Sequence, residues 1–172
     1  LYYIATKVTA NFDANGGKYY DATTVKSVEI DYNSLVAPVA PAGYDAPSRE
    51  GYTFGGWQGL NDSTRLKADR TFTAIWTPNE YTISFDLGTP TTKFDTVSLP
   101  SMEGYADSAI NPDDIPAAPK KYGYTFHHWE LNGERYDLKT YPTEDIVLTP
   151  YWVESDYSAF VGLDAYEKLS GN

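Results

Sequence analysis

The sequence feature that most constrains the fold is an internal duplication. The chain of 172 residues reads GYTFGGW at Gly51–Trp57 and GYTFHHW at Gly123–Trp129, which begins 72 residues later. A catalytic or binding motif is rarely written twice at this distance, whereas a folding unit often is. The first question is therefore whether the neighbouring residues repeat as well.

Three further landmarks recur at spacings of 72 to 76 residues. They are a proline, a Phe-Asp pair and a closing aromatic strand, found as Pro47 and Pro119, Phe12-Asp13 and Phe85-Asp86, and Phe72–Trp76 and Leu148–Trp152. The spacing drifts by a few residues, as expected where loops of different length join fixed elements. The sequence therefore predicts two tandem domains, residues 1–77 and 78–153, followed by a tail at 154–172.

Each copy has the periodicity of β-strands. Alternating β-branched and aromatic residues predict strands at 6–13, 24–32, 51–57 and 71–76 in the first copy, and at 81–86, 123–129 and 146–152 in the second. A Gly/Asn turn follows the first strand. The proline-rich stretches before Gly51 and Gly123 exclude a long helix but allow a short helical turn. We expect a mainly β fold of about four strands per copy.

The tail has a different pattern. Its apolar residues Phe160, Leu163, Tyr166 and Leu169 stand at steps of three, with Ser155 or Asp156 as a possible N-cap. The pattern predicts a short amphipathic helix, which either leads into a following module or docks on the second copy.

Composition excludes several classes of function. The chain has no cysteine, so disulfides, thiolate zinc sites and a cysteine nucleophile are excluded. Its net charge is −11, and no basic patch exists to bind nucleic acid or anionic membranes. No apolar run approaches membrane-spanning length. Since the chain opens on Leu1 and its one methionine is Met102, we expect it to be part of a longer protein.

No catalytic or cofactor motif is present, so we expect no enzyme activity and no cofactor. His127 and His128 are neighbours in a predicted strand and should point to opposite faces, so they should not share a metal; His128 and Glu130 should share a face. The acidic pairs Asp113-Asp114 and Glu144-Asp145 lack the spacing of an EF-hand loop, and the former suits a turn or helix cap better than a calcium site.

The aromatic residues allow two interpretations. Residues at equivalent places in both copies are best explained as structural anchors of two small cores, namely Phe12, Trp57, Trp76, Phe85, Trp129 and Trp152. Tyrosines that strand alternation does not explain are candidate ligand-binding rings, namely Tyr19, Tyr20, Tyr44, Tyr105 and Tyr122. Three or more exposed rings in a line would favour carbohydrate binding.

These motifs resemble the Listeria–Bacteroides repeat, the internalin B-type B repeat. Phe12–Gly17, Pro47, Gly51–Trp57 and Ala74–Trp76 match it in the first copy, and the second copy departs from it at 86–90, at His127-His128 and at Pro150-Tyr151. The resemblance implies an α+β, β-grasp-like (ubiquitin-like) unit on secreted or wall-attached bacterial proteins, where such units act as spacers and adhesion modules.

We therefore expect a non-catalytic module of a bacterial cell-surface or secreted protein. Its expected partners are a host or bacterial surface protein or a glycan, together with neighbouring modules of the same chain. The short joint at Thr77–Glu80 contains a proline and predicts a semi-rigid spacer. The alternatives are a carbohydrate-binding module that uses exposed tyrosines and an enzyme accessory domain without a ligand.

Overall fold

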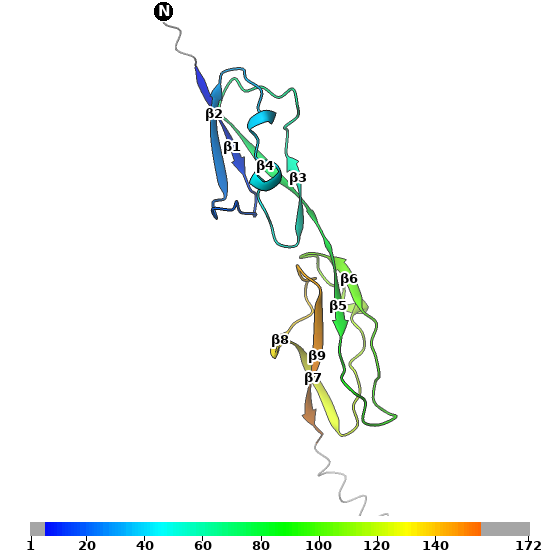
Figure 1. Cartoon of the computed structure of the whole chain (residues 1–172). Helices are drawn as coiled ribbons and strands as arrows, with labels where there is room; N and C mark the ends of the chain where they lie inside the picture. The colour runs from blue at the N-terminus through cyan, green and yellow to red at the C-terminus, as the bar shows by residue number, and fades with distance from the viewer. Residues whose placement is uncertain (1–5, 156–172) are drawn as a thin grey trace, which may run out of the picture. The chain divides into compact units, whose positions relative to one another are not determined.

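The computed structural model describes residues 6–155, which divide into two compact units, and the fold is mainly β (Figure 1). Unit 1 comprises the chain up to Glu80 together with Tyr105–Asp107, and unit 2 comprises Tyr81–Gly104 and the chain from Ser108. Each unit is built on one sheet, and each is described by itself below.

Unit 1 has a four-stranded sheet in the order β2-β1-β4-β3 (Figure 1). Its strands are β1 (Lys7–Asp13), β2 (Val25–Asp31), β3 (Tyr52–Trp57) and β4 (Arg70–Pro78). β1 pairs in parallel with β4, while β2 and β3 pair antiparallel on the outer sides. All four strands lie where the alternating sequence predicts them.

The core of unit 1 follows from the alternation in β1. Val8, Ala10 and Phe12 point to the buried face, and Phe12 stacks on Phe72 of β4 with ring centroids 5.6 Å apart. Trp57 of β3 packs edge-on against Phe12 at 5.0 Å. Small domains bury little apolar surface, and aromatic side chains bury the most area per residue. This aromatic cluster therefore forms the centre of the core of unit 1.

Unit 2 has a five-stranded sheet in the order β6-β5-β9-β7-β8 (Figure 1). Its strands are β5 (Glu80–Phe85), β6 (Met102–Tyr105), β7 (Tyr124–Leu131), β8 (Glu134–Tyr136) and β9 (Ile146–Glu154). β5 pairs in parallel with β9, and β7 pairs antiparallel with β9. Ile83 and Leu148 are fully buried in its core beside Trp129.

Unit 2 has five strands rather than about four, and the strands predicted for the second copy include neither β6 nor β8. β7 and β8 form a hairpin in which Leu131 pairs with Glu134. The two residues between them, Asn132 and Gly133, have φ angles of 53° and 84°. Asn-Gly is the preferred pair for such a two-residue turn, so the sequence carried a signal for this hairpin.

The irregular segments contain short helical turns, which their prolines allow. Three 3-10 helices lie there: η1 (Ala37–Val39) and η2 (Gly43–Asp45) in unit 1, and η3 (Pro112–Asp114) in unit 2. Residues 6–155 contain no α-helix, so the α part of the predicted α+β class is not found there. The predicted helix at 154–172 falls almost wholly outside the described residues.

The glycines at Gly16-Gly17 are explained by a tight turn against Trp76. The N–H of Gly17 donates to the carbonyl of Ala14 at 2.9 Å, and Asn15 and Gly16 have φ angles of 46° and 86°. The Trp76 indole N–H donates to the same carbonyl at 2.9 Å. A Cβ atom on Gly17 would lie 2.5 Å from the Trp76 ring, so only glycine fits beneath it.

We predict that Gly17→Ala destabilises unit 1 by about 1–3 kcal/mol, because the added methyl group forces the Trp76 ring to move. Urea unfolding followed by tryptophan fluorescence measures the change. The matched control is Lys18→Ala at the exposed neighbouring position, which should stay within about 0.5 kcal/mol of the parent. Equal effects of the two substitutions would contradict this account of the turn.

Candidate functional site

Two of the predicted ligand-binding tyrosines meet on the surface of unit 1. Tyr20 is 89% exposed and Tyr44 is 83% exposed, and their ring centroids lie 6.1 Å apart with an interplanar angle of 38°. The two residues are 24 positions apart in the sequence and come from different turns. Two large rings that are exposed side by side form an aromatic pair open to solvent.

The turn that carries Tyr20 is held by its neighbours. The N–H of Ala22 donates to the carbonyl of Tyr19 at 2.9 Å, with Ala22 at a φ angle of 64°. Asp21 accepts hydrogen bonds from the Thr23 hydroxyl at 2.6 Å and from the Thr23 N–H at 3.1 Å. These bonds keep the pKa of Asp21 below its ordinary value. The exposed ring of Tyr20 therefore stands on a fixed backbone.

Tyr44 is carried by the one-turn helix η2. Gly43 begins this helix with a φ angle of +57°, a conformation that costs glycine little. The N–H of Asp45 donates to the carbonyl of Ala42 at 3.1 Å and closes the turn. The central residue of so short a turn points outward, which places the Tyr44 ring in solvent beside Tyr20.

Tyr19 does not present a ring for ligand binding, contrary to the prediction. It is only 3% exposed, and its hydroxyl donates to the carbonyl of Phe12 at 2.9 Å. Burial, with smaller contributions from Asp13 and Asp21, raises the pKa of Tyr19 to about 12. Tyr19 therefore anchors the turn in the core, whereas the ring of its neighbour Tyr20 lies in solvent.

The other two predicted tyrosines do not join this pair through any described ring contact. Tyr105 ends β6 and is 56% exposed; Tyr122 lies just before β7 in unit 2 and is 66% exposed. The line of three or more rings that would favour carbohydrate binding is therefore not seen among the described residues. Their role in binding stays a prediction.

Asp95 fixes the backbone at Tyr122. Its carboxylate accepts hydrogen bonds from the Tyr122 N–H at 2.9 Å, the Thr92 hydroxyl at 2.7 Å and the Thr91 N–H at 2.7 Å. These donors, with Tyr122 first, hold the pKa of Asp95 well below its usual range. One half-buried carboxylate thus ties the loop after β5 to the segment just before β7.

The structural anchors predicted from the repeat lie in or against the two cores. Phe12, Trp57 and Trp129 are buried, and Trp76, Phe85 and Trp152 are half-buried. In unit 2, Phe85 and Phe126 contact the Trp129 ring with centroid distances of 4.6 Å and 5.0 Å.

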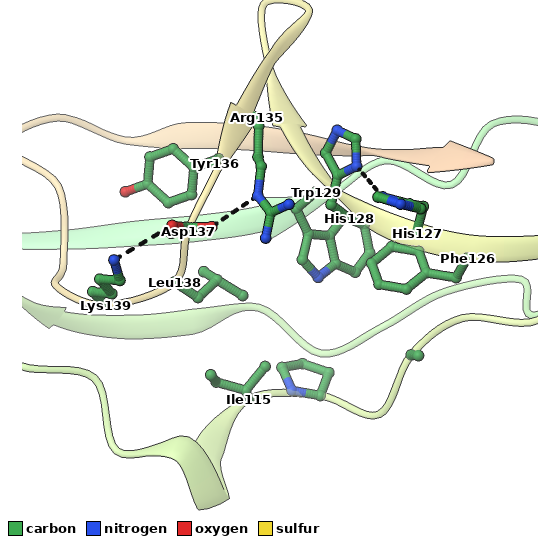
Figure 2. Close-up of a pocket in the computed structure, with 12 residues that line it drawn as sticks. Ile115, Phe126, His127, His128, Trp129, Arg135, Tyr136, Asp137, Leu138 and Lys139 are labelled. Atoms are coloured by element: carbon green, nitrogen blue, oxygen red, sulfur yellow. Dashed lines mark hydrogen bonds and ion pairs between the residues drawn. The ribbon is translucent and has the colours of Figure 1, made fainter. Parts of the chain in front are cut away.

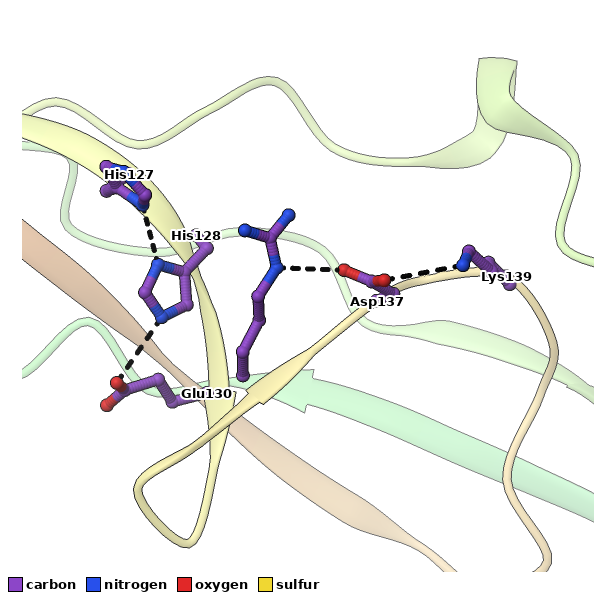
Figure 3. A network of polar contacts seen from close by, with 6 residues as sticks. His127, His128, Glu130, Asp137 and Lys139 are labelled. Carbon is purple, nitrogen blue, oxygen red and sulfur yellow. Dashed lines mark hydrogen bonds and ion pairs between the residues drawn. The ribbon is translucent and has the colours of Figure 1, made fainter.

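The predicted separation of His127 and His128 is wrong. Their Nδ1 atoms lie 2.8 Å apart, because a β-bulge between Phe126 and His128 inserts an extra residue and breaks the alternation of β7 (Figure 3). His128 Nε2 also lies 3.4 Å from Glu130 Oε1, as expected of residues on one face. Residues 6–155 contain no group of three or more His, Cys, Asp or Glu side chains arranged to hold a metal ion.

The acidic pairs have structural contacts. Asp113 and Asp114 lie in η3, where the Asn111 side chain accepts a hydrogen bond from the Asp113 N–H at 3.2 Å. Asp145 accepts a hydrogen bond from the Thr82 N–H at 2.9 Å. A second polar network, formed by Arg135, Asp137 and Lys139, was not anticipated from the sequence (Figure 2).

Comparison with known proteins accounts for the duplication. The profile of the Listeria-Bacteroides repeat domain matches residues 9–80 and 81–149. The chain belongs to this family. The resemblance noted from the paired GYTF motifs is thus confirmed, with two tandem copies of the repeat domain.

Two longer bacterial proteins are similar to this pair of Listeria–Bacteroides repeats. Internalin H of Listeria monocytogenes is 30% identical over 163 residues, covering 86% of this chain and 25% of internalin H. A protein of Evansella cellulosilytica, described as "Putative membrane protein", is 28% identical over 171 residues, covering 92% of this chain and 23% of that protein. The chain spans about a quarter of the length of these relatives. None of its described helices is long and apolar enough to cross a membrane.

We predict that Asp95→Ala speeds amide hydrogen exchange at Tyr122 several-fold at pH 7, because the acceptor for this N–H is lost. A carboxylate whose folded pKa is depressed stabilises the loop above its unfolded pKa of about 3.9, and this contribution is lost as pH falls through the lower folded pKa. The difference between variant and parent should therefore shrink in strong acid. Glu144→Ala, which removes the same charge elsewhere in unit 2, should leave Tyr122 unchanged.

Proposed function

We propose that the two repeats form a non-catalytic spacer and interaction module of a bacterial cell-surface or secreted protein. The observation that carries the proposal is that two complete sheets, each with its own core, follow one another in the chain. Adding such units in tandem lengthens a protein by a fixed amount per unit and requires no catalytic residues. The descriptions of the two similar proteins, a membrane protein and an internalin, support an extracellular location.

The joint between the sheets supports the spacer role. β4 ends at Pro78 and β5 begins at Glu80, so only Asn79 separates them. The N–H of Asn79 donates to the carbonyl of Gly51 at 2.9 Å, and the Thr53 hydroxyl donates to the Asn79 side-chain oxygen at 2.7 Å. A one-residue joint that is bonded to unit 1 has little freedom, unlike a flexible linker.

We also infer that each unit is a β-grasp-like sheet. A parallel central pair supports this inference, since β1 and β4 in unit 1 have the same relation as β5 and β9 in unit 2. Antiparallel strands flank each pair, as β3 flanks β4 and β7 flanks β9. The partners that we propose for such sheets are a host or bacterial surface protein or a glycan.

A second candidate function is carbohydrate binding, favoured by the exposed pair of Tyr20 and Tyr44. Rigid rings stack on sugar faces with little loss of side-chain entropy. Both rings are more than four-fifths exposed and stand on backbone turns fixed by hydrogen bonds. Two rings tilted at 38° suit two successive sugar units of a bent chain better than one flat ring.

The spacer role predicts a narrow range of distances between the units. The chain lacks cysteine, so Asp62→Cys with Glu134→Cys allows one spin label in each unit without background. We expect double electron–electron resonance to give a single narrow distance distribution. Inserting Gly-Ser-Gly-Ser after Asn79 should broaden it. A parent distribution as broad as that of the insertion variant would overturn the spacer role.

The carbohydrate role predicts saturable binding on an array of bacterial and host glycans. Tyr20→Ala and Tyr44→Ala should each weaken that binding about tenfold or more, because each removes one stacking face. The control is Tyr32→Ala, which removes another half-exposed tyrosine of unit 1. Absence of binding to every glycan, or equal losses in the three variants, would remove this candidate.

A further inference from the structure

An open groove of about 520 Å³ lies in unit 2 (Figure 2). Phe126 and Trp129 of β7 line its inner side, and Ile115, Pro116 and Ala118 line the opposite side. The residues that follow β7 in the hairpin, from Arg135 to Lys139, form its rim. The groove is therefore built largely by the β7–β8 hairpin and by the bulge in β7, neither of which was predicted from the sequence.

The equivalent hollow of unit 1 serves as an internal comparison. It has about 290 Å³ and lies against Phe54 and Trp57, the counterparts of Phe126 and Trp129. There the Trp57 indole N–H donates to the carbonyl of Pro41 at 3.0 Å, which ties the irregular segment to the sheet. The same scaffold thus has a smaller hollow in one copy and a wider one in the other.

Trp129 lacks the hydrogen bond that Trp57 makes. Its side chain is 7% exposed, and no hydrogen bond joins its indole N–H to an acceptor among residues 6–155. Because no fully buried side-chain nitrogen or oxygen of these residues lacks a partner, this N–H is accessible from the groove. Figure 2 shows the indole nitrogen on the edge of the ring that faces Ile115 across the groove. An accessible N–H without a protein partner is available to a ligand that brings an acceptor.

The rim supplies further donors. Asp137 bonds Arg135 Nε at 3.1 Å and Lys139 Nζ at 3.4 Å, which orients both cations beside the groove (Figure 2). Within the described part of the chain, the two terminal guanidinium nitrogens of Arg135 have no acceptor. A planar guanidinium with free terminal nitrogens is suited to a carboxylate.

The walls favour a peptide over a sugar. A sugar needs an exposed aromatic face, but Trp129 is covered by Phe85 and Phe126, whose centroids lie within 5.0 Å of it. The opposite wall, formed by Ile115, Pro116 and Ala118, is aliphatic and suits an apolar side chain. β8 is the outermost strand of its sheet, and such an edge can pair with the backbone of an extended peptide.

We propose that this groove of unit 2 binds an extended peptide segment of a partner protein, taking an apolar side chain against Phe126 and Ile115 and a neighbouring carboxylate at Arg135. The proposal rests on the interaction role above and names its site and partner chemistry. The Trp129 N–H then donates to a carbonyl or carboxylate oxygen of the peptide. Unit 1 lacks the rim cations and the free indole donor, so it does not share this activity.

The experiment measures binding of the whole chain to an array of peptides of about eight residues. Each peptide carries one Asp or Glu two positions from a Leu, Ile or Phe, so that both side chains share a face when extended. Paired peptides carry Asn or Gln in place of the acid. We expect a subset of the acidic peptides to bind, and the amide peptides to bind at least about tenfold more weakly.

Three variants locate the site. Arg135→Gln should weaken binding about tenfold or more, because it removes the charged partner of the carboxylate. Ala118→Trp should abolish binding by filling the groove, while Ala117→Trp, at the exposed neighbour that does not line the groove, should leave it unchanged. All three positions are exposed, so the folded state should persist, which circular dichroism checks.

Three outcomes would overturn the proposal. They are no peptide binding at millimolar concentration, equal binding by the acidic and amide peptides, and equal effects of the two tryptophan substitutions. Binding of oligogalacturonate, a carboxylate-bearing sugar, in place of peptides would overturn it too. The distance distribution between the units does not depend on this groove, so such a failure leaves the spacer role standing.

Discussion

The parallel pairing of the first strand with the last strand holds each unit together. In unit 1 it places Phe12 of β1 against Phe72 of β4, and both side chains are fully buried. In unit 2 the pairing of β5 with β9 buries Ile83 and Leu148. The partners are about 60 residues apart, so this contact closes nearly the whole repeat, and the outer strands β2, β3 and β7 are attached to the central pairs that it creates.

The two repeats share a backbone feature, a β-bulge, but carry different side chains at it. Both contain a bulge at the same place in the strand, between Phe54 and Trp57 and between Phe126 and His128. The first copy uses Gly56 at a φ angle of +100°, whereas the second places a histidine pair there. A bulge that both copies preserve holds the following tryptophan in the core, while the bulged residues are free to diverge.

The tryptophans of unit 1 link the sheet to the irregular segments. The indole N–H of Trp57 bonds Pro41 and that of Trp76 bonds Ala14, so each ring fills the core and fixes a loop at once. Tyr20 and Tyr44 stand on loops beyond these attachment points. Neither bond has a counterpart among the described hydrogen bonds of unit 2, and the Trp129 indole lines a groove with a charged rim.

The sequence by itself determined the duplication and most of the strands, because side-chain alternation and repeated motifs are local properties. It also contained the Asn132-Gly133 signal for the missed hairpin. Only the tertiary structure decided that Tyr19 is buried while Tyr20 is exposed, that Tyr20 meets Tyr44, and that His127 and His128 lie together. The physical reason is that the burial of a side chain in a turn or bulge depends on which distant segment covers it. A pattern of period two cannot report that, because turns and bulges are the places where the period is broken.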